Sequence, residues 1–252
     1  MTDLRQIKID PLSIRSLHIE LLALGRSIGV ATGIICKSNE RNWLVTNWHV
    51  LSGRSPQTGQ PQHPKGAIPD QVRIAHHSTK LGTWKLIDET LLDSSQEPLW
   101  IEHPKGNEVD VAALPLTHLD KEILLYDFDL SLADTDLVPQ VAMPVSIIGF
   151  PLGFSSAGAF PIWKTGHIAS DPELDYQGIP AFLIDATTRL GMSGSPVVVR
   201  LFGGYATRSG TLVMASGSQR TRFLGLYSGR IHQDSEIGLV WRPRLISELI
   251  SQ

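Results

Sequence analysis

Residues 191–199 read GMSGSPVVV, in which two serines stand among glycines and are followed by a proline and three valines. In one interpretation this is a turn that leads into a buried strand, because glycine supplies backbone freedom and β-branched residues favour strands. In the other, the turn presents a serine hydroxyl to a substrate and points backbone N–H groups at the place where an oxyanion forms. Short glycine–serine patterns recur by chance, so the rest of the chain has to decide between the two.

Short apolar runs separated by glycine, proline, aspartate and asparagine recur along most of the 252 residues. They are too short for helices and rich in valine, isoleucine, leucine and tryptophan, so they predict the strands of an antiparallel all-β protein. The predicted strands are residues 28–36, 43–45, 72–75, 83–87, 109–116, 145–150, 181–184, 196–201, 223–227 and 238–241.

Other segments lack this pattern. Residues 126–140 have no period and divide the strand series into two halves, which predicts a linker. Residues 52–70 and 203–222 are polar and are expected to be surface loops, with residues 211–215 able to form an extra strand. Residues 244–250 place four apolar side chains on one helical face directly after a proline, which predicts a short helix.

Composition narrows the possible partners. A hydrophobic content of 42% is enough for a buried core, and the net charge of −3 without a long block of one sign argues against a nucleic-acid partner. No apolar run approaches the roughly 18 residues that span a bilayer, and MTDLRQIKID lacks the pattern of a secretory signal. We therefore expect a cytoplasmic protein with no membrane partner. No cofactor motif is present, and the single cysteine, Cys36, is expected to be a small buried residue.

A serine is a weak nucleophile unless a base takes its proton and an acid orients that base. WLVTNWHV, residues 43–50, ends an apolar strand in His49, and VDVAALPL, residues 109–116, places Asp110 in a run that otherwise predicts burial. A buried carboxylate is costly unless it is paired, so we expect Asp110 to have a partner. The adjacent His76 and His77 would point to opposite faces of a strand, and we expect no metal site there.

Taken together, these motifs resemble those of trypsin-like serine peptidases. LVTNWHV is similar to the histidine motif of that family, VDVAALPL to its aspartate motif and GMSGSPV to its serine motif, and their order is also the family's. The stretches IIGFPLG, TGHIAS, IDATTRLGMSGSPV and FLGLYSG resemble the second half of bacterial HtrA-type peptidases and glutamyl endopeptidases. The resemblance implies two antiparallel six-stranded β-barrels of the chymotrypsin-like fold with a short C-terminal helix.

The resemblance also implies a division of the chain. Residues 1–125 would form the N-terminal barrel that carries the histidine and aspartate, and residues 126–140 the linker. Residues 141–241 would form the C-terminal barrel that carries the serine, and residues 242–252 the C-terminal helix.

The implied activity is that of a serine endopeptidase acting on proteins or peptides through an acyl-enzyme. Ser193 would be the nucleophile, His49 the general base and then acid, and Asp110 the residue that orients the imidazole. The N–H groups of Gly191 and Ser193 would form the oxyanion hole, while Ser195 takes the place of a second glycine. The substrate pocket would be walled by Thr187, Thr188, Arg189, Tyr227, Ser228, Gly229 and Arg230, with Ser228 also solvating the aspartate.

The pocket residues predict poor cleavage after lysine or arginine, because Thr187 stands where enzymes with that preference carry an aspartate. Thr188 matches a threonine with which glutamyl endopeptidases bind a substrate carboxylate. Tyr227 replaces the histidine of those enzymes and suits a small neutral residue. We therefore expect a small neutral or an acidic residue before the scissile bond.

Met192 stands where the digestive enzymes carry an aspartate that pairs with a new N-terminus, so activation by cleavage is not expected. A regulatory protein partner could instead order the loop at residues 189–192. Two other functions stay open: a catalytically inactive trypsin-like domain that binds proteins, and an α/β-hydrolase esterase. The esterase is disfavoured because GMSGS does not match G-x-S-x-G, and because the histidine and the aspartate precede the serine.

Overall fold

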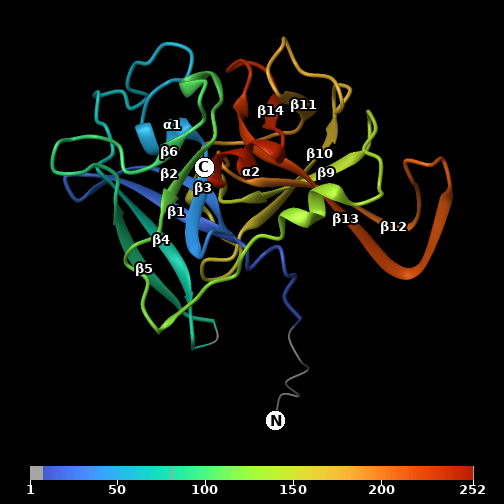
Figure 1. Cartoon of the computed structure of the whole chain (residues 1–252), viewed down its shortest axis with the longest axis horizontal. Helices are drawn as coiled ribbons and strands as arrows, with labels where there is room; N and C mark the ends of the chain where they lie inside the picture. The colour runs from blue at the N-terminus through green and yellow to red at the C-terminus, as the bar shows by residue number, and fades with distance from the viewer. Residues whose placement is uncertain (1–7, 81, 252) are drawn as a thin grey trace.

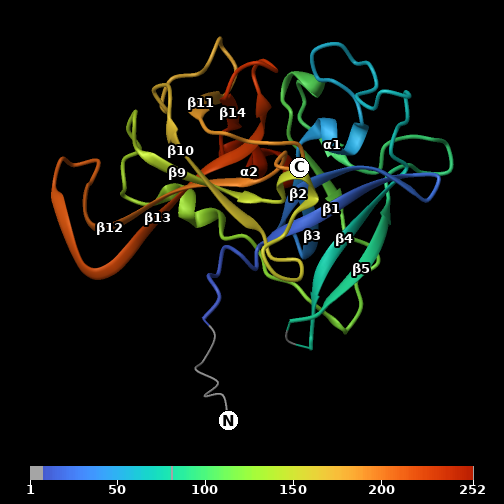
Figure 2. The same ribbon diagram turned by 180° about the vertical axis from the view of Figure 1, so that it is seen from behind.

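A computed structural model describes residues 8–80 and 82–251, whose strands form two antiparallel sheets lying side by side (Figures 1 and 2). The second sheet is a closed six-stranded barrel in the order β10-β11-β14-β13-β12-β9. The first has eight strands in the order β5-β4-β1-β2-β3-β7-β6, with β8 paired to β4. The predicted all-β fold with a short C-terminal helix is therefore confirmed, although the first half contains more strands than the six expected.

The elements of the first sheet are contributed by the first half of the chain. The strands are β1 (Ser16–Ala23), β2 (Arg26–Ser38), β3 (Arg41–Thr46), β4 (Gln71–Ser78), β5 (Trp84–Thr90), β6 (Ile101–Glu102), β7 (Ala112–Pro115) and β8 (Ile123–Leu124). Helix α1 (Trp48–Ser52) follows β3, and the 3₁₀ turns η1 (Gly106–Glu108) and η2 (Leu130–Asp134) flank β7 and β8.

The elements of the barrel follow in the second half. They are β9 (Pro144–Gly149), η3 (Pro151–Gly153), β10 (Ile162–Ile168), β11 (Ala181–Asp185), β12 (Pro196–Ala206), β13 (Leu212–Arg230), β14 (Ile237–Trp241) and α2 (Arg244–Ile250). No helix in the described part of the chain is long and apolar enough to cross a membrane.

One hydrophobic cluster joins the two halves. It contains Ile34 and Val45 from the first sheet, Val198 and Leu226 from the barrel, and the apolar face of α2. The four residues of that face, which the sequence pattern predicted, are all buried: Leu245, Ile246, Leu249 and Ile250. The buried face of α2 thus packs against both sheets. This packing fixes the positions of the side chains that each sheet contributes to the region between them.

Several regions differ from the sequence expectation. β10 was not predicted as a strand, and β3 ends at Thr46, so His49 lies in helix α1 rather than at the end of an apolar strand. β1 was not predicted, although Leu17, Ile19 and Leu21 alternate with polar residues and the strand pairs with β2 and β4. Residues 203–222, expected to be a loop, continue β12 and β13 as an arm that projects from the barrel in Figure 1. At positions 203–214 and 219–222, most residues of the arm are solvent-exposed, so the composition there resembles that of a loop even though the backbone is paired.

Candidate active site

The structure brings together three residues that are far apart in the chain. His49 lies in α1, which is separated from β3 by Asn47 alone, and Asp110 lies in the short segment between η1 and β7. Ser193 lies in the turn between β11 and β12, so it reaches the other two from the second sheet. The Nε2 atom of His49 is 3.0 Å from Ser193 Oγ, and its Nδ1 atom is 2.7 Å from Asp110 Oδ2.

The carboxylate of Asp110 is almost completely buried and fully engaged by hydrogen bonds. Its Oδ1 atom accepts the backbone N–H of His49 at 2.8 Å, and its Oδ2 atom also accepts the hydroxyl of Ser228 at 2.5 Å. These bonds supply the partners that the buried position demands. Because a carboxylate only accepts, His49 Nδ1 carries a proton, and Nε2 in the neutral ring is left as an acceptor facing Ser193.

A break in the strand pairing explains how Ser228 reaches the site. The register between β13 and β14 shifts between Tyr227 and Gly229, which leaves Ser228 as the extra residue of a bulge. Its carbonyl oxygen accepts the Ser193 hydroxyl at 2.8 Å, while its own hydroxyl donates to Asp110. The single Ser193 proton therefore has two acceptors, and rotation about the Cβ–Oγ bond redirects it from this carbonyl to His49.

The turn that carries Ser193 also contains two backbone N–H groups that bear on the chemistry. Within the described residues, neither Gly191 N–H nor Ser193 N–H donates to an acceptor of the protein. The orientation of the first is set by the preceding carbonyl, because Leu190 C=O accepts the N–H of Leu152 at 2.6 Å. In a trans peptide the N–H points opposite to the C=O, so Gly191 N–H faces away from Leu152.

The first sheet also holds this turn in place. The fully buried Thr32 of β2 donates its hydroxyl to Gly191 C=O at 2.9 Å and its N–H to Ser193 C=O at 2.9 Å. Sequence reasoning missed Thr32 and Leu152. Nothing in their local sequence signals a role, because the partners of Thr32 lie about 160 positions away, at residues 191 and 193.

The neighbours of Ser193 in the turn face inward. Met192 is completely buried in the barrel core, so apolar packing occupies the position where the digestive enzymes carry an aspartate. Ser195 is also completely buried, and its hydroxyl points at Gly149, where a Cβ would lie 2.0 Å from Ser195 Oγ. Of the two serines in the motif, only Ser193 presents its hydroxyl to His49.

The expected substrate pocket is largely filled by the protein itself. Tyr227 is buried against Gly238, and its hydroxyl is hydrogen-bonded to the hydroxyl of the buried Thr188. Burial raises the pKa of Tyr227, so this hydroxyl stays neutral. The ring thus occupies space that a long substrate side chain would need.

The two arginines of the predicted pocket are exposed and share one acidic neighbour. Arg189 and Arg230 lie 3.7 and 3.9 Å from the same carboxylate oxygen of Glu236. Glu236 was not predicted as a site residue, and it offsets the positive potential that would attract an acidic substrate. Thr187 is exposed, and Gly229 lies in the bulged part of β13 beside Ser228.

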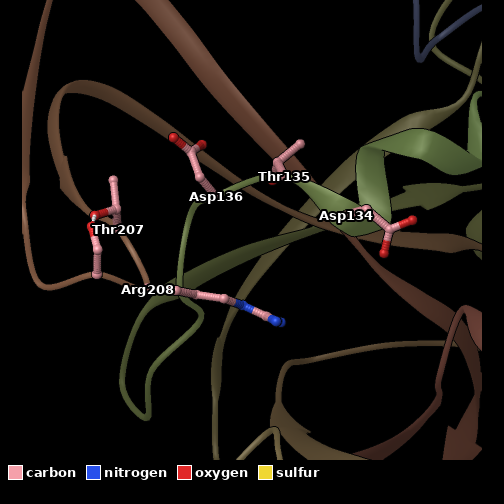
Figure 3. A pocket seen from close by; sticks show the side chains of 6 residues that line it. Asp134, Thr135, Asp136, Thr207 and Arg208 are labelled. Atoms are coloured by element: carbon pink, nitrogen blue, oxygen red, sulfur yellow. Dashed lines mark hydrogen bonds between the residues drawn. The ribbon is translucent and has the colours of Figure 1, made fainter.

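A separate hollow of about 400 Å³ lies between η2 and the projecting arm. Figure 3 shows Asp134, Thr135, Asp136, Thr207 and Arg208 around it. The Asp136 carboxylate accepts hydrogen bonds from Tyr205 and Arg220, so it ties the arm to the segment after η2. None of the predicted site residues lines this hollow.

Comparisons with known proteins identify the family of the chain and proteins of similar fold. The family model of the trypsin-like peptidase domain matches residues 31–201, a range that contains His49, Asp110 and Ser193. The serine endoprotease from Yersinia pestis is similar in fold, with a TM-score of 0.53 and 13% identity over 96% of this chain and 66% of that one. The active form of the Rv3671c protease from M. tuberculosis has a TM-score of 0.49 and 19% identity over 95% of this chain and 80% of that one. No curated protein sequence matches the chain.

Proposed function

The chain belongs to the family of trypsin-like peptidase domains, and on that premise we propose that it is a serine endopeptidase with a triad of Ser193, His49 and Asp110. The main support for the proposal is the pair of hydrogen-bond contacts that His49 makes. Its Nδ1 atom lies 2.7 Å from Asp110 Oδ2, and its Nε2 atom lies 3.0 Å from Ser193 Oγ. The two free N–H groups next to that hydroxyl support it, because acyl transfer needs both an activated nucleophile and an oxyanion site.

The reaction follows from the positions of the protons. Ser193 Oγ attacks the scissile carbonyl while its proton passes to His49 Nε2, and the imidazolium is stabilised by Asp110. The oxyanion accepts the N–H groups of Gly191 and Ser193. His49 then gives the proton to the departing amine as the C–N bond breaks, and a water molecule repeats the sequence to release the acid and free Ser193.

We further propose that a small neutral residue precedes the scissile bond. Tyr227 and Thr188 leave little depth behind Ser193, and the exposed Arg189 and Arg230 are balanced by Glu236. Of the two preferences predicted from the sequence, these contacts favour the neutral one over the acidic one. Control by a regulatory protein stays a prediction.

A fluorophosphonate probe with mass-spectrometric mapping of the labelled residue tests the proposal. We expect wild-type protein to be labelled at Ser193 and to hydrolyse peptides, and Ser193→Ala to lose both while its thermal unfolding midpoint is kept. Ser195→Ala is the matched control and should retain labelling and substantial hydrolysis, because its hydroxyl is buried away from His49.

Two outcomes would contradict the assignment. Peptide hydrolysis by Ser193→Ala would show that another residue is the nucleophile. Wild-type protein that is folded, unlabelled and inactive would favour the alternative of a binding module built on a peptidase fold.

A further inference from the structure

A cavity of about 410 Å³ opens beside Ser193 and His49. Its volume lies within the roughly 300–1,000 Å³ that is typical of ligand-binding pockets. Its walls come from β2, from the loop between α1 and β4, from η3 and from the turn before Ser193. The side chains that give the cavity its character are those of Ile28, Val30, Pro64, Ala67, Leu152 and Leu190.

The cavity is lined mainly by apolar side chains. None of its lining residues is Asp, Glu, Lys or Arg, and apart from His49 and Ser193 its only polar side chains are those of Gln62 and His63. Leu190 is 82% exposed and Leu152 is 53% exposed, so two large apolar side chains face solvent at the edge of the site. Covering such side chains with an apolar group is favourable, whereas burying a charged group there is not.

The cavity is distinct from the expected substrate pocket. The pocket walls are contributed by residues 187–189 and 227–230, and none of these residues lines the cavity. In the proposed reaction, the part of the substrate that becomes bonded to Ser193 is the part before the scissile bond. The side chain of that residue occupies the substrate pocket walled by Tyr227 and Thr188. The segment that leaves with the new amine is then the part of the substrate that can enter the cavity.

A backbone hydrogen bond fixes one edge of the cavity. Leu152 has a φ of 55°, a left-handed conformation that is costly for a leucine, and in this conformation its N–H binds Leu190 C=O. That one bond orients Gly191 N–H and also holds the two leucines at the edge of the cavity. Strain of this kind persists where the surrounding contacts impose it, and it is common at functional sites.

We infer that this cavity binds an apolar side chain just after the scissile bond and that it supplies more of the substrate selectivity than the pocket before the bond. This inference rests on the proposed peptidase activity and deepens it. The substrate class is thus a polypeptide in which a small neutral residue is followed by a large aliphatic or aromatic one.

Acyl transfer measures this preference separately from the first half of the reaction. An N-acyl-alanine thioester forms the acyl-enzyme at Ser193, and the amide of a single amino acid then competes with water for it. The amine nitrogen attacks the acyl carbon, its proton passes to His49 Nε2, and the bond from Ser193 Oγ breaks as Oγ regains that proton. This is the reverse of the leaving step, so the nucleophile occupies the leaving-group site.

We expect leucinamide and phenylalaninamide to capture the acyl-enzyme at least about tenfold better than lysinamide or the amide of aspartic acid, the ratio expected for burying one large apolar side chain. Leu190→Glu places a negative charge at the edge of the cavity. It should lower capture by leucinamide and raise capture by lysinamide, each by about threefold or more. Leu174→Glu changes a leucine that is 67% exposed and does not line the cavity, so it should partition like wild type.

The outcomes separate this inference from the proposed function. Thioester turnover with equal capture of all four amides would overturn the inference and leave the peptidase assignment intact. A folded wild-type protein with no thioester turnover and no fluorophosphonate label would overturn both. If the Leu190→Glu variant forms the acyl-enzyme but distributes it between the four amides and water as the wild type does, the cavity is not the source of the selectivity, and the inference is wrong.

Discussion

At the scale of single residues, a buried hydroxyl shapes the site as much as the exposed one does. Thr32 Oγ1 donates to Gly191 C=O at 2.9 Å and accepts the N–H of Phe150 at 3.2 Å. The carbonyl of Thr32 in turn accepts the hydroxyl of Thr46 at 2.8 Å. This side chain therefore connects β2 to both loops that surround the free N–H groups, and every polar atom in the connection is paired.

Replacing Thr32 tests this connection. Thr32→Val keeps the shape of the side chain but leaves Gly191 C=O and Phe150 N–H unpaired, so the turn should be less well oriented. We expect kcat to fall about tenfold or more with little change in KM, because the oxyanion site matters most in the transition state. Thr32→Ser retains the hydroxyl and should recover most of the loss. Steady-state kinetics of both variants measures the split.

A purely structural role for Thr32 would give a different result. Both variants would then lose stability without a selective loss of kcat in the molecules that remain folded. Equal kcat values for Thr32→Val and wild type, or a serine variant no better than the valine variant, would contradict the assigned role.

At the scale of elements, the decisive one is the turn between β11 and β12 rather than a strand or helix. Gly191 and Gly194 have φ values of 92° and 82°, which are unfavourable for other residues. Space is also lacking at both positions. A Cβ at 191 would lie 2.2 Å from Phe150 C=O, and a Cβ at 194 would lie 2.0 Å from Thr32 C=O. Close backbone approach and left-handed geometry together require glycine at both.

Gly191→Ala should therefore displace the turn. We expect kcat to fall by about 100-fold or more, since a misdirected N–H removes an oxyanion donor. Gly178→Ala is the matched control, because Gly178 has a φ of 80° but a Cβ added there would have no neighbouring atom within 4 Å. It should cost about 1–2 kcal/mol of stability through backbone strain and leave kcat unchanged. Kinetics together with thermal unfolding distinguishes the two, and similar losses of kcat in both variants would contradict the role assigned to Gly191.

At the scale of the whole molecule, packing across the two sheets decides where the site residues meet. The cluster that contains α2 is formed from both halves, and a second cluster fills the first sheet alone.

A buried histidine lies on β4, which contributes apolar residues to that second cluster. His76 is 1% exposed, and neither ring nitrogen has a hydrogen-bond partner in the described part of the chain. Burial lowers the pKa of His76 to about 4, and the nearby charge of Glu89 only partly opposes this.

This histidine should make stability depend on pH. The unfolded state takes up a proton near pH 6.5, whereas the folded state does so only near pH 4. Between these values the unfolded state binds more protons, so the free energy of unfolding falls as the pH falls from about 6.5 towards 4. The total change is roughly 3 kcal/mol from this residue alone. Burial also lowers the pKa values of His18 and His77, which adds to the effect in the same direction.

Denaturant unfolding at several pH values measures this dependence. We expect His76→Phe to flatten the slope between pH 4 and 6.5 without abolishing it, because His18 and His77 still contribute. Parallel slopes for His76→Phe and wild type would show that the buried imidazole is not responsible.

Much of this protein could be predicted from its sequence because the relevant signals are local. Runs of β-branched residues between turn residues predicted most strands, and the spacing of four apolar residues predicted α2. The three motifs marked His49, Asp110 and Ser193, since each places a reactive side chain beside an unusual apolar run or a glycine turn. The burial of Cys36 was predicted correctly as well.

What only the tertiary structure decided depends on contacts between distant residues. Thr32 meets the turn 159 positions away, and the left-handed Leu152 is imposed by the carbonyl that it binds rather than by its own preference. The residue types of the predicted substrate pocket allowed either a small neutral or an acidic residue before the scissile bond. Only the structure shows that two of those residues, Tyr227 and Thr188, are buried and hydrogen-bonded to each other. Local sequence determines which backbone conformations are low in energy. Hydrogen bonds and packing between segments far apart in the chain determine which N–H groups stay free and which cavity stays open.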